Sequence, residues 1–163
     1  MVCDCEQVVQ SQFSPGLVGN DEDIVYCLID PDLYDRAAGT LKNKAFSKTD
    51  LRKTTLSVVR RRYSSDGEVE AKVIEPQVAR NPQRQFCGVL VCQSVEIRSI
   101  NEICEQDICV ADAGLEGFES HAHLGFSNEI TAKSRSFQEA ARSNLVAAFQ
   151  NRGIIGLETA FGS

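Results

Sequence analysis

The sequence predicts one α+β domain, with a mixed or mainly antiparallel sheet and a long C-terminal amphipathic helix packed on one face. A chain of 163 residues with 42% hydrophobic residues has the size and composition of one domain with a real core. Apolar strand-like runs precede a helical periodicity, without a regular alternation of strand and helix. We therefore treat residues 1–163 as one domain, with residues 1–22 as a candidate loosely ordered N-terminal segment.

Three segments carry the pattern of strands. Residues 23–29, DIVYCLI, form a short apolar run, and residues 56–63, LSVVRRRY, are β-branched at their centre. The strongest candidate is residues 85–100, QFCGVLVCQSVEIRSI. Its first part is apolar on both faces, as in a central strand, and it alternates later at Val95 and Ile97.

A helix is predicted after Ser65, which is a suitable N-cap residue. Val69 and Val73 are four residues apart and give this helix one apolar face. Pro76 has no backbone N–H, so the helix is expected to stop near Ile74 or to continue briefly after a kink.

The C-terminal helix is predicted over residues 137–151. Ser136 and Glu139 have the spacing of a capping box, and Gly153 is placed to terminate the helix. The apolar residues fall on one helical stripe: Phe137, Ala141, Leu145, Ala148 and Phe149.

Charge is strongly segregated along the chain, although the net charge is only −6. Residues 1–40 hold eight acids and one base, which gives −7. Residues 41–63 hold eight bases and one acid, which gives +7, and residues 101–129 hold seven acids and no base. A basic block between acidic segments can pair with them inside the fold, or it can present a basic face to an acidic partner.

The basic block supplies the candidate partner-binding residues, which would contact another protein with an acidic surface. They are Arg52, Lys53, Arg60, Arg61 and Arg62. On a strand, consecutive arginines alternate faces, so Arg60 and Arg62 are expected on the same side. Two alternatives stay open: pairing inside the fold, and nucleic-acid binding through residues 42–62. The negative net charge argues against the last.

Both histidines of the chain lie one residue apart, in the segment GFESHAHLGFS. The apolar residues around them share one parity, which turns them into the core: Phe118, Ala122, Leu124 and Phe126. His121 and His123 then project together from the other face and are weak candidate metal ligands. A metal site needs further ligands, which would be drawn from Cys3, Cys5, Asp112 and Glu119. No metal site is predicted, and a metal-dependent hydrolase or nuclease centred on the two histidines is the alternative function.

The seven cysteines are odd in number and include no C-x2-C pair. Cys27 and Cys92 lie inside apolar runs, where a reduced cysteine behaves as a small hydrophobic residue. We therefore expect buried reduced thiols.

Sequence motifs of catalysis are absent, since there is no G-x-S-x-G, P-loop, H-E-x-x-H or dinucleotide fingerprint. No cofactor is expected, and a protein without enzymatic activity is favoured. A cysteine–histidine nucleophile pair is assembled in space and cannot be read from spacing, although Cys87 is the best-placed candidate. No run of eighteen apolar residues and no signal-like N-terminus is present, so no membrane contact is expected and a cytoplasmic location is predicted.

The segment GTLKNKAFSKTDLRKTTLSVVRR, together with HAHLGFS before an alanine-rich helix, resembles a pattern in small uncharacterised bacterial proteins. His121 and Ala122 match this pattern, whereas Arg60 to Arg62 do not. The resemblance implies a bacterial origin, a shared fold and an accessory or interaction role, and it transfers no catalytic residue. The predicted function is a non-catalytic interaction module or accessory subunit of a bacterial multi-protein system, such as a defence or toxin-linked assembly.

Overall fold

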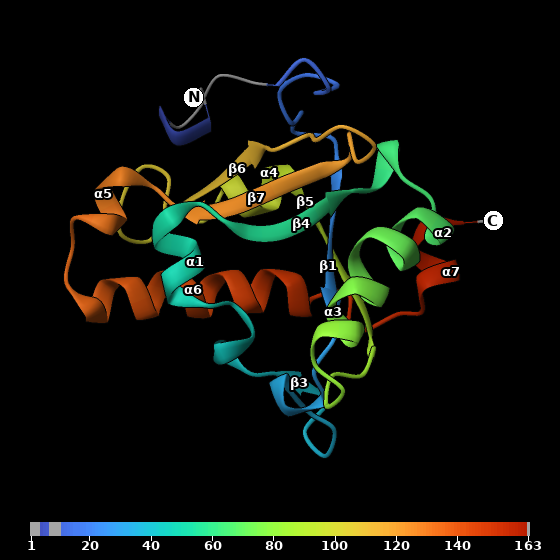
Figure 1. Ribbon diagram of the computed structural model, residues 1–163. Coiled ribbons are helices and arrows are strands. Elements are labelled where there is room, and N and C mark those ends of the chain that lie inside the picture. The colour runs from blue at the N-terminus through green and yellow to red at the C-terminus, as the bar shows by residue number, and fades with distance from the viewer. Residues whose placement is uncertain (1–3, 7–10, 163) are drawn as a thin grey trace.

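A five-stranded antiparallel sheet forms the centre of the computed structural model, which describes residues 4–6 and 11–162 (Figure 1). In spatial order its strands are β5 (Gly88–Gln93), β1 (Asp23–Leu28), β4 (Leu56–Arg60), β7 (His121–Phe126) and β6 (Ile108–Asp112). A separate two-stranded hairpin consists of β2 (Tyr34–Asp35) and β3 (Thr40–Leu41). The α+β prediction is confirmed.

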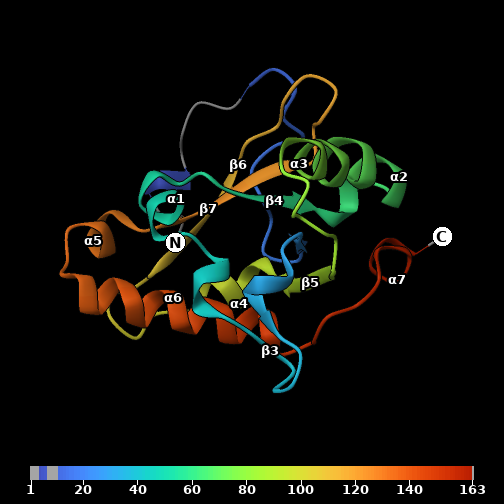
Figure 2. The same cartoon turned by 60° about the horizontal axis from the view of Figure 1, so that its bottom comes forward.

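Helices cover both faces of the sheet, as Figure 2 shows. One face packs against α6 (Arg135–Gln150), and an aromatic cluster joins them. In this cluster the ring centroids of Tyr26 and Phe46 are 4.8 Å apart, and those of Phe46 and Phe149 are 5.4 Å apart. The short helices on or beside the sheet are η1 (Asp4–Glu6), η2 (Pro31–Leu33), η3 (Asn43–Ala45), α1 (Lys48–Lys53), η4 (Arg61–Tyr63), α4 (Ser94–Arg98) and α5 (Asn128–Thr131).

The opposite face is covered by one continuous helical segment and by α7 (Leu157–Phe161). The continuous segment is α2 (Asp66–Val69), a π-helical turn η5 (Glu70–Ile74) and α3 (Glu75–Arg80). Ser65 caps it as predicted. The helix continues to Arg80 because Pro76 lies in the first turn of α3, directly after the wider π turn, where the missing N–H leaves no bond unmade.

The predicted strand over residues 85–100 is too long, because only six of these sixteen residues form β5. β5 ends at Gln93, and α4 begins there because Gln93 and Glu96 form a reciprocal cap. The Gln93 backbone N–H donates to Glu96 Oε2 at 3.0 Å. The alternation of Val95 and Ile97 is therefore that of a helical turn, with Val95 exposed and Ile97 buried.

The long C-terminal helix is confirmed, but its first turn differs from the prediction. It begins at Arg135, so the capping box of Ser136 and Glu139 is not formed. The Glu139 carboxylate instead forms an ion pair with Lys48, with 2.7 Å between Glu139 Oε1 and Lys48 Nζ. Phe137 is 47% exposed, whereas Ala141, Leu145 and Phe149 are buried as predicted.

Residues 4–6 belong to the segment 1–22, for which loose order is predicted, and they contact the sheet. Cys5 and Cys109 of β6 are joined by a disulfide. Glu6 is buried, and its carboxylate accepts from Arg98 Nη2 at 2.9 Å and from the Val110 backbone N–H at 2.8 Å. Residues 1–3 and 7–10 of this predicted segment lie outside the described part of the chain.

The cysteines within the described residues are either disulfide-bonded or free. Reduced thiols were expected throughout, which is wrong for the disulfide pair Cys5 and Cys109. Cys27 and Cys92 are free and buried, and burial raises the pKa of each thiol to about 12. Along the described chain, none of the helices has the length and apolar character needed to cross a membrane.

Candidate functional site

The basic run that follows β4 is paired inside the protein. Three consecutive arginines form ion pairs with three consecutive acidic residues: Arg60 with Glu22, Arg61 with Asp23 and Arg62 with Asp21. The cause is the antiparallel pairing of β1 with β4, which sets residues 21–23 beside residues 60–62. Of the alternatives for the basic block, internal pairing is the one that the structure contains.

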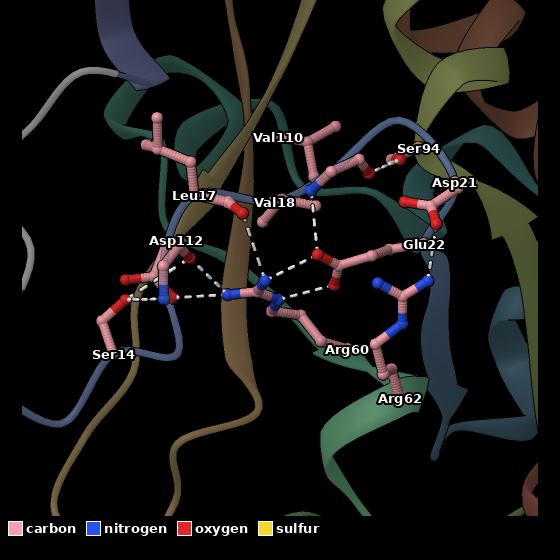
Figure 3. A network of polar contacts seen from close by, with 12 residues as sticks. Ser14, Leu17, Val18, Asp21, Glu22, Arg60, Arg62, Ser94, Val110 and Asp112 are labelled. Carbon is pink, nitrogen blue, oxygen red and sulfur yellow. Dashed lines mark hydrogen bonds and ion pairs between the residues drawn. The ribbon is translucent and has the colours of Figure 1, made fainter.

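Arg60 is completely buried, and every one of its guanidinium nitrogens donates a hydrogen bond (Figure 3). Nε and Nη2 form a bidentate pair with Glu22 at 2.8 and 2.7 Å. Nη1 donates to Asp112 Oδ1 at 2.9 Å and to the Gly16 carbonyl at 2.7 Å, and Nη2 also donates to the Leu17 carbonyl at 3.3 Å. The prediction that Arg60 docks a partner is wrong, because its charge is enclosed and saturated.

The other candidate partner-binding residues remain on the surface. Arg61 and Arg62 keep side-chain exposures of 38% and 48% while paired with acids. On α1, Arg52 Nε donates to Gln138 Oε1 at 2.8 Å, and Lys53 is exposed. Their role in binding a partner stays a prediction. Together with Arg60 they do not form a continuous surface of unpaired arginines.

The sheet opens between β1 and β4. Two residue pairs join these strands, Ile24 with Arg60 and Val25 with Val59, whereas β1 pairs with β5 over six residues. In Figure 1, β1 runs from top to bottom of the view and β4 runs across it, so the two strands diverge beyond the last pair. Continued pairing in the same register would set Cys27 opposite Ser57.

The backbone groups at this opening can be assigned from the bonds on the far side of each strand. The Arg60 N–H donates to the Ser120 carbonyl at 2.7 Å, on the β7 side, and the Leu28 carbonyl accepts from Cys87 on the β5 side. Successive residues of a strand point their N–H and C=O groups to opposite sides. Ser57 and Cys27 therefore direct theirs into the opening, where neither has a strand partner within the described residues.

A cavity of about 380 Å³ occupies this opening, and we call it the β1–β4 cleft. Cys27 and Ser57 line it from the two strands. Its walls include apolar side chains from both strands, from η2 and from the π turn: Val25, Leu33, Val59 and Val73. Its charged and polar lining residues include Asp30, Lys44, Asp50, Gln77 and Arg84.

His121 connects β7 to the cleft. Its Nδ1 lies 3.1 Å from the Ala113 carbonyl, and its Nε2 lies 2.8 Å from Ser57 Oγ. A carbonyl oxygen can only accept, so Nδ1 carries the ring proton and Nε2 accepts from the Ser57 hydroxyl. As predicted, His123 projects beside His121, with ring centroids 4.6 Å apart. Phe118 precedes the strand and stacks on His121 at 5.2 Å, so its predicted place on the opposite face is wrong.

The two imidazoles are neutral at pH 7. Burial lowers the pKa of His121, and burial together with the neighbouring His121 lowers the pKa of His123 to about 4. Both ring nitrogens of His121 already have partners, and Asp112 is bound to Arg60. The described residues contain no group of three or more His, Cys, Asp or Glu side chains able to hold a metal ion. Cys3, one of the further ligands considered, lies outside them.

The lowered pKa of His123 predicts an acid-dependent loss of stability. An unfolded histidine has a pKa near 6.5, so protons bind the unfolded chain first as the pH falls. The free energy of unfolding should therefore decline between pH 6.5 and about 4, and then level off for this group. His123→Gln should remove this part of the decline when both proteins are unfolded in urea across that range. Identical pH profiles for the two proteins would contradict the assignment.

Sequence reasoning identified His121 but missed Ser57 and the cleft. Ser57 is a polar residue between apolar neighbours of a predicted strand, a signal that could have drawn attention to it. Its contact with His121 spans 64 residues and depends on the pairing of β4 with β7. No family model, no curated protein and no solved structure matches this chain, so its function has to be inferred from the cleft and its surroundings.

Proposed function

We propose that the protein is an interaction module that binds an extended segment of a partner protein in the β1–β4 cleft. The observation that carries this proposal is the interrupted pairing of the sheet. Pairing stops after Val25 and Val59, both strands continue, and the opening between them is a cavity.

The unpaired backbone at this opening favours an extended polypeptide as the ligand. A backbone N–H or C=O group that is buried without a hydrogen-bond partner costs free energy. Cys27 and Ser57 each direct one N–H and one C=O toward the cleft. An extended segment offers donors and acceptors at the spacing of a strand, which is how sheet edges bind partner chains. The segment would pair with one strand edge, since β1 and β4 diverge.

Charge at the rim does not select one type of segment. The residues that line the cleft include two cations, Lys44 and Arg84, and two anions, Asp30 and Asp50. Apolar side chains at alternate positions of the segment would contact Val25, Val59 and Val73. The predicted binding of an acidic protein surface therefore remains a proposal for residues outside the cleft: Arg52, Lys53, Arg61 and Arg62.

Two further proposals depend on the sequence alone. Membership of a bacterial multi-protein system, defence-linked or toxin-linked, follows from the resemblance of residues 39–61 and 121–127. Nucleic-acid binding through residues 42–62 loses four of its eight cations to internal ion pairs, those of Lys48, Arg60, Arg61 and Arg62. The cleft is therefore the stronger basis for a function.

The proposal is tested with decapeptides selected from a random displayed library and measured by fluorescence anisotropy. Gln77→Trp fills the cleft from α3 and should weaken binding at least tenfold, whereas Ala79→Trp lies on the same helix, is exposed and does not line the cleft. N-methylation of alternate peptide nitrogens should also weaken binding, because it removes strand hydrogen bonds and keeps every side chain.

Binding should protect the Cys27 or Ser57 amide from hydrogen exchange. Equal affinities for the Gln77→Trp and Ala79→Trp variants, or unchanged exchange at both amides, would show that the peptides bind elsewhere and would overturn the proposal.

A further inference from the structure

We propose that Ser57 is a nucleophile activated by His121, and that the segment bound in the β1–β4 cleft is its substrate. This inference rests on the proposed function for its substrate, while the nucleophile itself is tested separately below. It makes the protein a hydrolase of extended polypeptide, cleaving a carbonyl bond of the bound segment.

The geometry is that of a nucleophile, a base and a group that orients the base. Ser57 is exposed, lines the cleft and lies 2.8 Å from His121 Nε2. The Ala113 carbonyl holds the other ring nitrogen at 3.1 Å and so fixes the tautomer in which Nε2 is free to accept a proton. A backbone carbonyl here takes the place that a carboxylate has in serine hydrolase triads.

The base is held in one orientation by its neighbours. Phe118 stacks on the ring with an interplanar angle of 21°, and His123 meets it edge-on at 84°. The pKa of His121 is lowered by burial, so the ring is unprotonated and able to accept a proton at pH 7. A rigid, neutral base beside an exposed hydroxyl is pre-organised for proton transfer.

The reaction consumes one water for each bond cleaved. The Ser57 oxygen attacks a carbonyl carbon of the segment, and the hydroxyl proton passes to His121 Nε2. The bond from the carbonyl carbon to the leaving nitrogen breaks, and His121 returns the proton to that nitrogen, which leaves an acyl ester on Ser57. Water then attacks the carbonyl carbon of this ester while His121 takes a proton from the water. The bond from the carbonyl carbon to the Ser57 oxygen breaks, and His121 passes the proton to that oxygen.

The donors available to the developing oxyanion are backbone groups. Ser57 and Cys27 direct N–H groups into the cleft without strand partners in the described chain. The same groups that attract an extended segment can thus stabilise negative charge on its carbonyl oxygen.

Diisopropyl fluorophosphate tests the nucleophile without any peptide. Labelling forms a bond from the Ser57 oxygen to phosphorus, breaks the phosphorus–fluorine bond, and passes the hydroxyl proton to His121 as fluoride leaves. We expect one adduct, mapped to Ser57 by peptide mass spectrometry and absent in Ser57→Ala. Ser143→Ala, which removes the hydroxyl of a serine on α6 that does not line the cleft, should leave labelling unchanged.

His121→Gln should slow labelling at least 100-fold, the range that general base catalysis contributes. The labelling rate should fall with acid only below pH 6.5, because the base has a lowered pKa. Melting curves of each variant confirm that it is folded, and since Ser57 is exposed its replacement by alanine is expected to be tolerated.

The outcomes separate this inference from the proposed function. Labelling of Ser57 that depends on His121, with cleavage of a cleft-binding decapeptide by the unmodified protein and not by Ser57→Ala, supports the inference. Peptide binding without any Ser57 adduct, or labelling that is equally fast in His121→Gln, overturns it and leaves the interaction module standing. Labelling without peptide binding in the cleft overturns the polypeptide substrate together with the proposed function.

Discussion

Arg60→Met should lower the free energy of unfolding by about 3–5 kcal/mol, the range measured when one partner of a buried ion pair is removed. The variant keeps an apolar side chain of similar length but leaves the Glu22 and Asp112 carboxylates buried without a cation. Asp112 already has one buried oxygen, Oδ2, without a hydrogen-bond partner. The Arg60 guanidinium carbon also lies 4.7 Å from the centroid of the Tyr63 ring, and the substitution removes this contact as well. Urea unfolding monitored by circular dichroism measures the change.

Arg62→Met is the matched control, since it removes the same residue type two positions further along. Its ion pair with Asp21 lies at the surface, where such pairs contribute little to stability. Arg60→Met combined with Glu22→Gln should recover part of the loss, because one of the stranded carboxylates is neutralised. Similar stabilities for Arg60→Met and Arg62→Met would contradict the buried cluster. The buried charges make Arg60 a structural residue of the fold.

Phe149→Ala is expected to cost about 3–5 kcal/mol of unfolding free energy, the usual range for a buried aromatic residue cut back to alanine. Its ring lies 5.4 Å from that of Phe46 and 6.5 Å from that of Tyr26, in the layer between α6 and the sheet. Removing the ring opens a cavity that these rigid neighbours cannot refill. Denaturant unfolding again provides the measurement.

Phe137→Ala is the control on the same helix. Sequence periodicity placed both phenylalanines on one buried stripe, but Phe137 is 47% exposed. The Lys133 ammonium nitrogen lies 5.4 Å from the centroid of the Phe137 ring. Its truncation should change stability far less than that of Phe149. Equal losses from the two substitutions would mean that the first turn of α6 is docked as firmly as the last.

The start of β4 shows how tertiary contacts shape the cleft. Thr54, which precedes the strand, has a positive φ of 54°, an uncommon conformation for a β-branched residue. It packs closely against Gly125 of β7, where an added Cβ would lie 2.7 Å from the Thr54 Cα. This close approach packs the C-terminal end of α1 against β7, directly before the start of β4.

The sequence by itself determined the elements whose cause is local. Ser65 caps its helix, Val69 and Val73 form the buried face, and the spacing of Leu145 and Phe149 orients α6. Alternation along residues 121–126 correctly placed both histidines on one face of a strand. These predictions hold because they depend on the 3.6-residue and two-residue periods of the backbone, which act within a few positions.

Only the tertiary structure decided which distant residues meet. From the sequence Arg60 is a surface cation, but the fold places Glu22, just before β1, and Asp112 of β6 beside it, from 38 and 52 residues away. The disulfide joins cysteines 104 residues apart, and Ser57 reaches His121 across 64 residues. The cleft exists because two strands pair over two residues and then diverge. Strand order and register arise from packing of the whole chain, so burial of a charge, a serine–histidine contact and an opening in a sheet leave no periodic signal in the residues that form them.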